Sequence, residues 1–412
     1  MNRPGNQMST FLMEPLFPDD PDLLREAEKL VSAATHLGRH LHPETLTAVT
    51  DLLRTVNCYY SNLIEGHDTH PIDIERAMRS DYSRESVTRN LQEEARAHIE
   101  VQLLMEQRLD ADAAVNVCSS DFLCWLHREF YSRVPAPMRV VRNPETGREE
   151  PVIPGALRHH DVKVGYHVAP PFAEVPDYLR RFGEAYRPSL FDGPGALVSL
   201  AAAHHRLLWI HPFGDGNGRV ARMMTDGYLR LRTIGGHGLW TASRGLGRKR
   251  TEYLAALAEA DRDRWNDYDG RGSRSRKALI AFCEFFFDVC MDQINYMGGV
   301  LAVDALAERV ENYARGRESA MWPDRHGSTA RDSRLPAGSA HLLRDLMYRG
   351  KLGRGEVARL TGLPERTARR LVHHLLDEGF LRSETSRAPL RFRIPAHAGP
   401  YFFPGLYNPT RS

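Results

Sequence analysis

With 412 residues, the chain is too long for one small domain, and we expect two or three compact units. Hydrophobic residues make up 42% and charged residues 26%, both ordinary for a soluble globular protein. The formal net charge is only +2, so overall charge gives no argument for nucleic-acid binding.

The cysteines and the apolar runs restrict the compartment. The chain has an odd number of cysteines and no CxxC pair: Cys58, Cys118, Cys124, Cys283 and Cys290. This pattern favours reduced thiols over a disulfide framework or a zinc site. The first residues lack the apolar core of a signal peptide, and the richest apolar run, 278–290, is short and contains Glu284 and Asp288. We therefore expect a cytoplasmic protein with no membrane partner.

Helical patterns dominate the chain, with apolar residues recurring at intervals of three and four. In chain order, we expect helices at 22–36, 43–60, 84–109, 120–132, 175–187, 195–210, 217–232, 249–260 and 276–314. Residues 137–169 hold Pro, Gly and short Val or Ile runs, and 158–168 alternates in part, as a hairpin would. Residues 315–338 are polar and lack a period, which predicts a linker.

The last part of the chain differs in charge. We expect three short helices at 340–349, 354–362 and 366–378, followed by two short strands within 380–394. From residue 341 to the end there are 13 Lys and Arg against 6 Asp and Glu. A basic excess confined to one end of a nearly neutral chain indicates a nucleic-acid module.

The segment 211–222, HPFGDGNGRVAR, separates two expected helices. Pro212 and three glycines end the first helix, and the second begins at Asn217. A Gly-rich turn that opens a helix presents free backbone N–H groups and the positive end of the helix dipole, so it binds anions. The backbone of residues 216–218 can cradle phosphate oxygens.

The side chains of this segment suit a polyphosphate. Arg219 and Arg222 lie three residues apart and share one helix face, which puts two guanidinium groups beside the anion site. Asp215 offers a hard oxygen ligand for a Mg²⁺ ion that bridges phosphates. His211 is placed to take a proton from an incoming hydroxyl, and an imidazole pKa of about 6.5 suits that task. The alternative is a plain connector, which the spacing of all these residues disfavours.

These residues resemble the signature of the Fic (Fic/Doc) family, HPFx(D/E)GNGRxxR, and match every fixed position. The resemblance covers roughly residues 50–300 and implies a mainly α fold, a Fic-type helical bundle with a short β-hairpin flap, here followed by a small C-terminal winged-helix domain. We expect four segments: an N-terminal helical region at 1–110 with an inhibitory helix around 56–66, the Fic catalytic core at 111–314, the linker at 315–338, and a winged helix-turn-helix with a tail at 339–412. Most members with an intact motif transfer AMP from ATP to Ser, Thr or Tyr hydroxyls of proteins.

The resemblance implies a role for each matching residue. His211 would be the general base, Phe213 would pack under the loop, and Asp215 would bind Mg²⁺. Contacts to ATP would come from Gly216, Asn217 and Gly218 at the α- and β-phosphates, Arg219 along the phosphate chain, and Arg222 at the γ-phosphate. The hydroxyl would attack the α-phosphorus, and pyrophosphate would leave.

Two further stretches resemble the family. Residues 155–168 are similar to the flap hairpin that covers the site and docks the target segment by strand addition. Residues 246–271 resemble the region at the adenine end, where Tyr253 is the candidate contact and a plain amphipathic helix is the alternative. We interpret His204 as a structural histidine, and His159 and His160 as surface or target-contact residues without metal-ligand spacing.

Residues 61–66, SNLIEG, match a second family motif, (S/T)xxxE(G/N). Ser61 and Glu65 are four apart and project from one helical face, and Gly66 ends that helix without strain. The resemblance implies that Glu65 pairs with Arg222, excludes the γ-phosphate and so inhibits the enzyme. The alternatives are an ordinary surface Ser and Glu, or a Glu65 that positions water so that the same site removes AMP.

Residues 339–395 resemble a winged helix-turn-helix, with a tight turn at 361–364. Its second helix carries the candidate DNA contacts Arg366, Arg369 and Arg370. A protein-docking or dimerisation unit is an equal alternative. We expect the aromatic tail at 400–409 to pack back on a domain.

We therefore predict an autoinhibited protein adenylyltransferase that uses ATP and Mg²⁺ and modifies a hydroxyl side chain of a protein, itself included. A DNA-binding regulator that senses ATP or ADP without transfer is the first alternative. Removal of AMP at the same site, and transfer of another group such as phosphate or phosphocholine, are the others. The family also suggests a homodimer.

Overall fold

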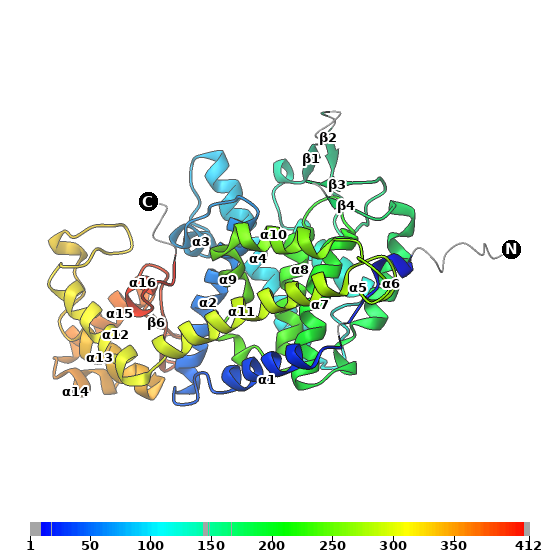
Figure 1. Cartoon of the computed structure of the whole chain (residues 1–412). Coiled ribbons are helices and arrows are strands. Elements are labelled where there is room, and N and C mark those ends of the chain that lie inside the picture. Colours follow the sequence, from blue (N-terminus) through cyan, green and yellow to red (C-terminus); the bar gives the residue numbers. More distant parts are fainter. Residues whose placement is uncertain (1–9, 18, 143–146, 148, 166, 408–412) are drawn as a thin grey trace. The chain divides into compact units, whose positions relative to one another are not determined.

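The protein is described by a computed structural model that covers residues 10–17, 19–142, 147, 149–165 and 167–407 (Figure 1). Most of its elements are helices, and its strands are confined to short antiparallel pairs. The chain divides into two compact units, one formed by residues 1–35, 57–69 and 81–294, the other by 36–56, 70–80 and 295–412. The prediction of a mainly α fold is confirmed. The four expected segments follow one another along the chain, whereas each of these units combines separate stretches, so the four segments stay a prediction.

The first unit is built around α7 (Gly193–Ile210), which packs against α1 (Pro21–Thr35), α6 (Val175–Ala185) and α8 (Asn217–Leu231). Nearly every side chain of α7 from Ala196 to Ile210 is buried. Most of these residues are apolar, and the polar exceptions are Ser199 and 204–206. The other helices of this unit are α4 (Ser86–Ala111), α5 (Ser120–Tyr131), α9 (Ala242–Arg248), α10 (Arg250–Ala260), the end of α2 (Pro43–Ile64) and most of α11 (Arg276–Val300).

Two hairpins belong to the first unit. β3 (Lys163–Val164) pairs with β4 (His167–Val168), which confirms the hairpin expected within 158–168, although Tyr166 lies outside the described residues. β1 (Val140–Arg142) pairs with β2 (Glu149–Pro151), and Val141 lies opposite Glu150. This second hairpin was not predicted, because its strands are short and have no apolar alternation.

The second unit contains the winged helix-turn-helix. Helices α13 (Ser339–Arg349), α14 (Glu356–Thr361) and α15 (Glu365–Glu378) are followed by a sheet with the strand order β5 (Lys351–Leu352), β7 (Leu390–Phe392), β6 (Leu381–Arg382). Gly362, in the turn between α14 and α15, has φ +68°, a left-handed conformation that favours glycine. Also in this unit are the start of α2, α3 (Pro71–Met78), α12 (Val303–Glu318) and α16 (Gly399–Phe402).

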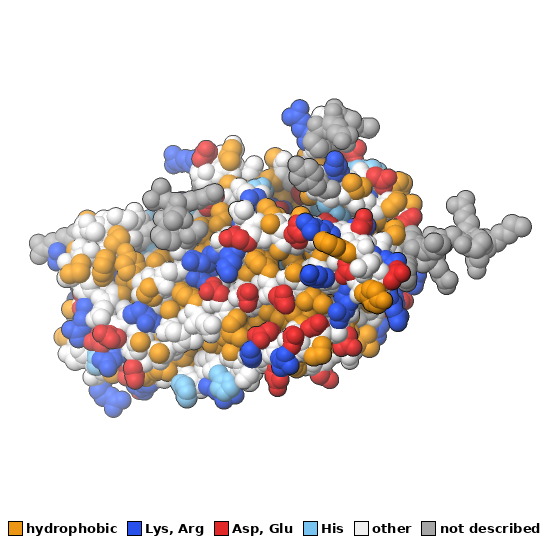
Figure 2. Space-filling model, viewed as in Figure 1, with side chains coloured by type: hydrophobic (Ala, Val, Ile, Leu, Met, Phe, Trp, Pro, Cys, Tyr) orange, Lys and Arg blue, Asp and Glu red, His pale blue; other side chains and the backbone are white. Residues whose placement is uncertain are grey.

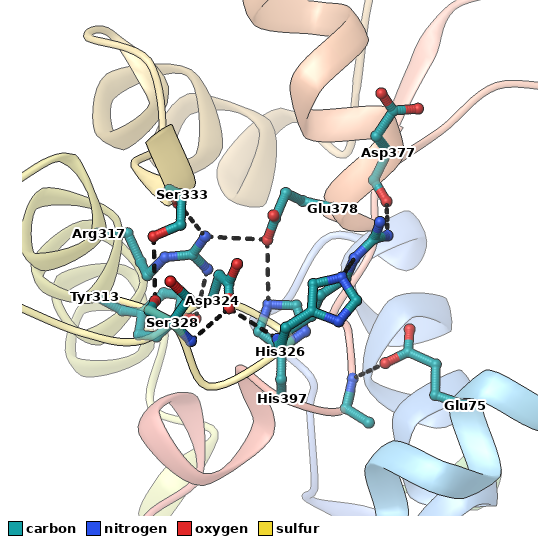
Figure 3. A network of polar contacts seen from close by, with 12 residues as sticks. Glu75, Tyr313, Arg317, Asp324, His326, Ser328, Ser333, Asp377, Glu378 and His397 are labelled. Carbon is teal, nitrogen blue, oxygen red and sulfur yellow. Dashed lines mark hydrogen bonds and ion pairs between the residues drawn. The ribbon is translucent and has the colours of Figure 1, made fainter. Parts of the chain in front are cut away.

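A buried arginine joins α12 to the winged helix (Figure 3). The Arg317 guanidinium is 1% exposed and donates from Nη2 to Glu378 Oε2 at 3.1 Å and to the Ser333 carbonyl at 3.0 Å. The structure therefore continues α12 into the segment expected as a linker and fixes the following loop to the end of α15. The tail packs back as expected, with Phe402, Phe403 and Leu406 buried, while Asn408 and Pro409 lie outside the described residues.

The expected helices agree with the structure, apart from one that is divided and three short helices that were not expected. Residues 276–314 form two helices, α11 and α12, instead of one, and Gly298 and Gly299 lie just before the break. The short helices α3, α9 and α16 were not predicted. Among the described residues, no helix has the length and apolar character needed to cross a membrane. In the space-filling view, Lys and Arg alternate with Asp and Glu over the visible face (Figure 2), in keeping with the small net charge.

Candidate functional site

The loop between α7 and α8 has an unusual backbone at both ends. His211 caps α7 with φ +50°, a left-handed conformation that costs a non-glycine residue about 1–2 kcal/mol. Gly216 has φ +78°, and a Cβ atom there would lie 2.6 Å from the Tyr131 ring, so only glycine fits. Strain of this kind is often found at functional sites.

The loop is held from inside by its own side chains. Asn217 Oδ1 accepts from the Phe213 backbone N–H, and Asn217 Nδ2 donates to the Phe213 carbonyl, both at 2.9 Å. The Phe213 ring is fully buried and stacks on the His127 ring, with centroids 4.1 Å apart. The two hydrogen bonds between Phe213 and Asn217 close the loop over five residues, directly before the first turn of α8.

Asp215 is positioned by two residues of α5. The Tyr131 hydroxyl donates to Asp215 Oδ2 at 2.6 Å, and His127 Nε2 lies 3.2 Å from the Asp215 carbonyl oxygen. His127 Nδ1 accepts from the Gly155 N–H at 2.8 Å, so the hydrogen-bond pattern assigns the ring proton to Nε2. Burial lowers the pKa of His127 to about 4, which keeps this ring neutral at pH 7.

A buried arginine fixes the base of the flap to the loop. Arg158 is 4% exposed; its backbone N–H donates to the Pro212 carbonyl at 2.9 Å, and its Nε donates to the His211 carbonyl at 2.8 Å. Its terminal nitrogens donate to the carbonyls of His160 and Pro170. The backbone on both sides of the expected flap is thus tied to the residue that begins the motif.

The His211 imidazole is neutral in this environment. Burial is the main reason that its pKa falls to about 4, and the nearby His167 and Arg158 add to the effect. A neutral imidazole can accept a proton, which a charged one cannot.

Arg222 is bound by the end of α2. Its Nη2 lies 2.6 Å from Glu65 Oε1, its Nε donates to Ser61 Oγ at 2.9 Å, and Nη2 also reaches the Ser61 carbonyl at 3.1 Å. α2 ends at Ile64, and Gly66, with φ +88°, lets the chain turn away directly after Glu65. A Cβ on Gly218 would lie 2.3 Å from Glu65 Oε1, so a glycine at the start of α8 makes room for this carboxylate.

Burial alone would raise the pKa of Glu65, but the charges of Arg222 and Arg219 outweigh it and hold the pKa below its usual value. Glu65 is therefore ionised at neutral pH, and its pairing with Arg222 is between full charges.

Arg219 also has a carboxylate partner, which sequence reasoning missed. Its Nη2 lies 2.6 Å from Glu94 Oε1 in α4, and both side chains are almost completely buried. His67 Nδ1 lies 2.7 Å from Glu94 Oε2. A signal was available, because Glu94 and His98 are polar residues one turn apart on the buried side of a long amphipathic helix. Tyr131, His127 and Arg158 carried no comparable signal.

Tyr253 and His204 lie together inside the first unit. The Tyr253 hydroxyl is 2.7 Å from His204 Nε2, and His204 Nδ1 is 2.7 Å from Thr225 Oγ1. Both residues are buried, and burial lowers the pKa of His204 to about 3. This supports the interpretation of His204 as a structural histidine. The adenine contact of Tyr253 stays a prediction, and its hydroxyl is already engaged.

The DNA-contact candidates lie on the outer face of α15. Arg366, Arg369 and Arg370 are exposed, and with His373 they line one shallow surface pocket. Arg369 is held by Glu365, 3.2 Å away and four residues earlier in the helix.

The comparisons with known proteins agree with this geometry. Residues 117–229 match the model of the Fic/DOC family, and residues 342–385 match that of the IclR helix-turn-helix domain. The chain is 32% identical over 83 residues to a "Protein adenylyltransferase Fic" from Drosophila willistoni and 37% identical over 84 residues to one from Drosophila ananassae. Each match covers 20% of this chain and 17% of the relative, so the chain spans only a small part of these relatives.

Two solved structures share the fold. A Fic family protein from Desulfovibrio desulfuricans G20 is similar over 92% of this chain and 98% of its own, with a TM-score of 0.50 and 18% identity. Fic-1 from C. elegans is similar over 68% and 72%, with a TM-score of 0.50 and 18% identity. The fold is thus the mainly helical Fic fold with small hairpins. Over the matched residues the chain is similar to the Fic/DOC family and, further along, to the IclR helix-turn-helix domain.

Proposed function

We propose that the protein transfers AMP from ATP to a hydroxyl side chain of a protein, and that Glu65 restrains this transfer. The observation that carries the proposal is the 2.6 Å pair between Glu65 Oε1 and Arg222 Nη2, inside a motif that is otherwise complete. The likeness to protein adenylyltransferases over 83 and 84 residues supports the same chemistry.

The loop and the first turn of α8 would bind the phosphates of ATP. Gly216 and Gly218 keep Cβ atoms out of the loop, and the N–H groups of the helix start attract an anion. Asp215 fits a Mg²⁺ ligand: its Oδ2 accepts from Tyr131, while its Oδ1 takes no hydrogen bond from the described residues. A bound Mg²⁺ would neutralise charge on the phosphate oxygens.

His211 would accept the proton of the target hydroxyl. The hydroxyl oxygen would then bond to the α-phosphorus, the bond from that phosphorus to the bridging oxygen would break, and pyrophosphate would leave. A pKa of about 4 makes His211 a weak base at rest. The negative charge of bound ATP would raise this pKa toward the working pH, where a general base is most effective.

The restraint would act on the nucleotide's pose. While Glu65 holds Arg222, the γ-phosphate lacks its cation and meets a carboxylate instead. The negative charges of the Glu65 carboxylate and the γ-phosphate repel each other, so ATP would bind with its α-phosphate away from the line along which the hydroxyl attacks. Removing the Glu65 carboxylate would return Arg222 to the γ-phosphate.

A second function is favoured by one specific observation. Residues 342–385 match a helix-turn-helix domain, and the second helix of that motif, α15, has three exposed arginines on its outer face. An exposed basic second helix suits the major groove of DNA. We propose that this domain binds DNA, with nucleotide sensing as the corresponding role of the Fic domain if no transfer takes place.

The test follows label on protein after incubation with ATP labelled at the α-phosphate. We expect weak labelling of the parent and strong labelling of Glu65→Gly. The double variant Glu65→Gly/His211→Ala should not be labelled. Ser61→Ala is the intermediate control, because it removes one hydrogen bond to Arg222 and leaves the ion pair with Glu65. Its labelling is expected to be stronger than that of the parent and weaker than that of Glu65→Gly. If Glu65→Gly binds ATP and labels neither itself nor any added protein, the transferase proposal is wrong. Loss of label from pre-labelled protein on adding the parent alone would identify removal of AMP instead.

A further inference from the structure

Three side chains that carry possible metal-ligand atoms converge where the expected flap (155–168) meets the β1–β2 hairpin, outside the loop 211–222. Glu150 lies in β2, while His159 and His160 follow Arg158. Glu150 Oε2 is 3.6 Å from His159 Nε2 and 3.3 Å from His160 Nδ1, and one ligand atom from each residue lies within 4.8 Å of the others. Sequence spacing did not indicate this cluster, because the carboxylate comes from a strand nine residues upstream.

Glu150 lies within ion-pair distance of both histidines, but no hydrogen bond joins these atoms. Glu150 Oε2 and His160 Nδ1 are buried atoms with no hydrogen-bond partner among the described residues, and both separations exceed the usual 2.7–3.2 Å of an N–H···O bond. Buried polar atoms left unpaired cost free energy, and such groups call for an explanation such as an ion. A tetrahedral ion with bonds of about 2.0–2.1 Å holds its ligands about 3.3–3.4 Å apart. The distances from Glu150 to the two histidines are close to that spacing.

We infer that Glu150, His159 and His160 form a site for a divalent transition-metal ion of the Zn²⁺ class. Two imidazoles and one carboxylate suit Zn²⁺, Co²⁺ or Ni²⁺, whereas Mg²⁺ prefers oxygen ligands only. The site is therefore chemically distinct from an oxygen site at Asp215. His159 is largely exposed, which leaves the fourth position open to water or to a ligand from another molecule.

An ion here would cross-link the β1–β2 hairpin to the segment that carries Arg158. The three ligands, Arg158 and Gly214 line one small pocket, and Arg158 donates to the His211 carbonyl. Metal binding would thus hold the β1–β2 hairpin against the backbone segment that Arg158 ties to the loop between α7 and α8. This inference needs no transfer activity, so it stands or falls apart from the proposed function.

The test is Zn²⁺ titration of the full chain after treatment with a chelator, followed by calorimetry. We expect one Zn²⁺ per chain, with affinity at least tenfold weaker in His160→Ala and in Glu150→Gln. His373→Ala is the matched control, since His373 faces Asp377 across one helical turn and offers an exposed two-ligand pair elsewhere; its affinity for the single ion should equal that of the parent. Stoichiometric binding that survives both Glu150→Gln and His160→Ala, or no stoichiometric binding by the parent, overturns the inference.

A second measurement reports on the site without depending on affinity. Co²⁺ bound at a four-coordinate site absorbs strongly in the visible region, and we expect this absorption in the parent and its loss in His159→Ala, whose side chain is exposed and whose replacement leaves the fold intact. Slower amide exchange at 149–151 and 158–160 on adding Zn²⁺ would locate the ion. Equal exchange with and without saturating Zn²⁺ would place it elsewhere and refute the assignment.

Discussion

Glu65 Oε1 lies 2.6 Å from Arg222 Nη2 and would lie 2.3 Å from a Cβ atom on Gly218. The carboxylate therefore fills the place that a side chain at the start of α8 would take. Because the pKa of Glu65 is lowered, the pair adds stability above the carboxyl pKa of the unfolded chain and loses it as the pH falls through the lowered value. The pair is intact at neutral pH.

Gly218→Ala and Glu65→Gly should be coupled. In the parent, the new methyl group meets the Glu65 carboxylate and the Arg222 guanidinium, and we expect a loss of about 1–3 kcal/mol in the free energy of unfolding. With Glu65→Gly already present, the loss should be smaller, because one of the clashing groups is gone. Urea unfolding of the four proteins measures this coupling. Additive losses would mean that Glu65 is not at the position described.

Glu94→Gln should destabilise the protein strongly. Arg219 and Glu94 are both buried, and removing one charge of a buried pair costs about 3–5 kcal/mol. Glu100→Gln is the matched control on the same helix: Glu100 pairs with Arg96 at 2.6 Å, but both side chains are about one-third exposed, so about 0–1 kcal/mol is expected. Similar urea midpoints for the two variants would contradict the prediction.

The free energy of unfolding should fall as the pH drops from about 6.5 toward 4. Burial is the largest cause that lowers the pKa of His98 and His204 to about 3, and of His127 and His211 to about 4. The unfolded chain binds more protons in this window, so each histidine costs about 1 kcal/mol at pH 5.5.

Asp226 opposes this trend. Burial raises its pKa to about 7, so its contribution is fully present below the usual carboxyl pKa and is lost as the pH rises through 7. One carboxyl does not offset four histidines, and urea midpoints at pH 7 and 5.5 should show the net loss. Replacing His204 by Phe should reduce the difference between the two midpoints, and an unchanged difference would exclude His204 as a contributor.

DNA binding by the helix-turn-helix should depend on salt and on the arginines of α15. Each substitution that removes a phosphate contact should decrease the slope of log affinity against log salt by about 0.9. We expect this change for Arg366→Ala and Arg370→Ala on a duplex, measured by fluorescence anisotropy. Arg344→Ala is the control, because Arg344 is paired with Glu311 at 2.7 Å and lies on α13. Equal binding by all variants would assign the domain to protein contacts.

The local parts of the fold and site could be predicted from sequence. The anion-binding loop, the start of α8 and the Ser61–Glu65 pair each depend only on residues that are close together in the sequence. Helical periodicity located most of the helices. The partners of the motif were not predictable in the same way. Glu94, Tyr131 and Arg158 lie 53–125 residues before the residues that they hold. The place of Glu94 on a buried helix face is a local signal that it has a partner, but it does not say which residue the partner is. Glu150 lies near His160 only because the fold brings β2 next to the segment that follows Arg158.

His211 is the left-handed residue that ends α7. Glycine adopts this conformation freely, so the chain keeps a histidine where a smaller residue would relieve backbone strain. Stability and the proposed chemistry thus make opposite demands on one position. Selection for a higher unfolding temperature alone would therefore favour glycine at position 211. That replacement would remove the imidazole proposed as the general base.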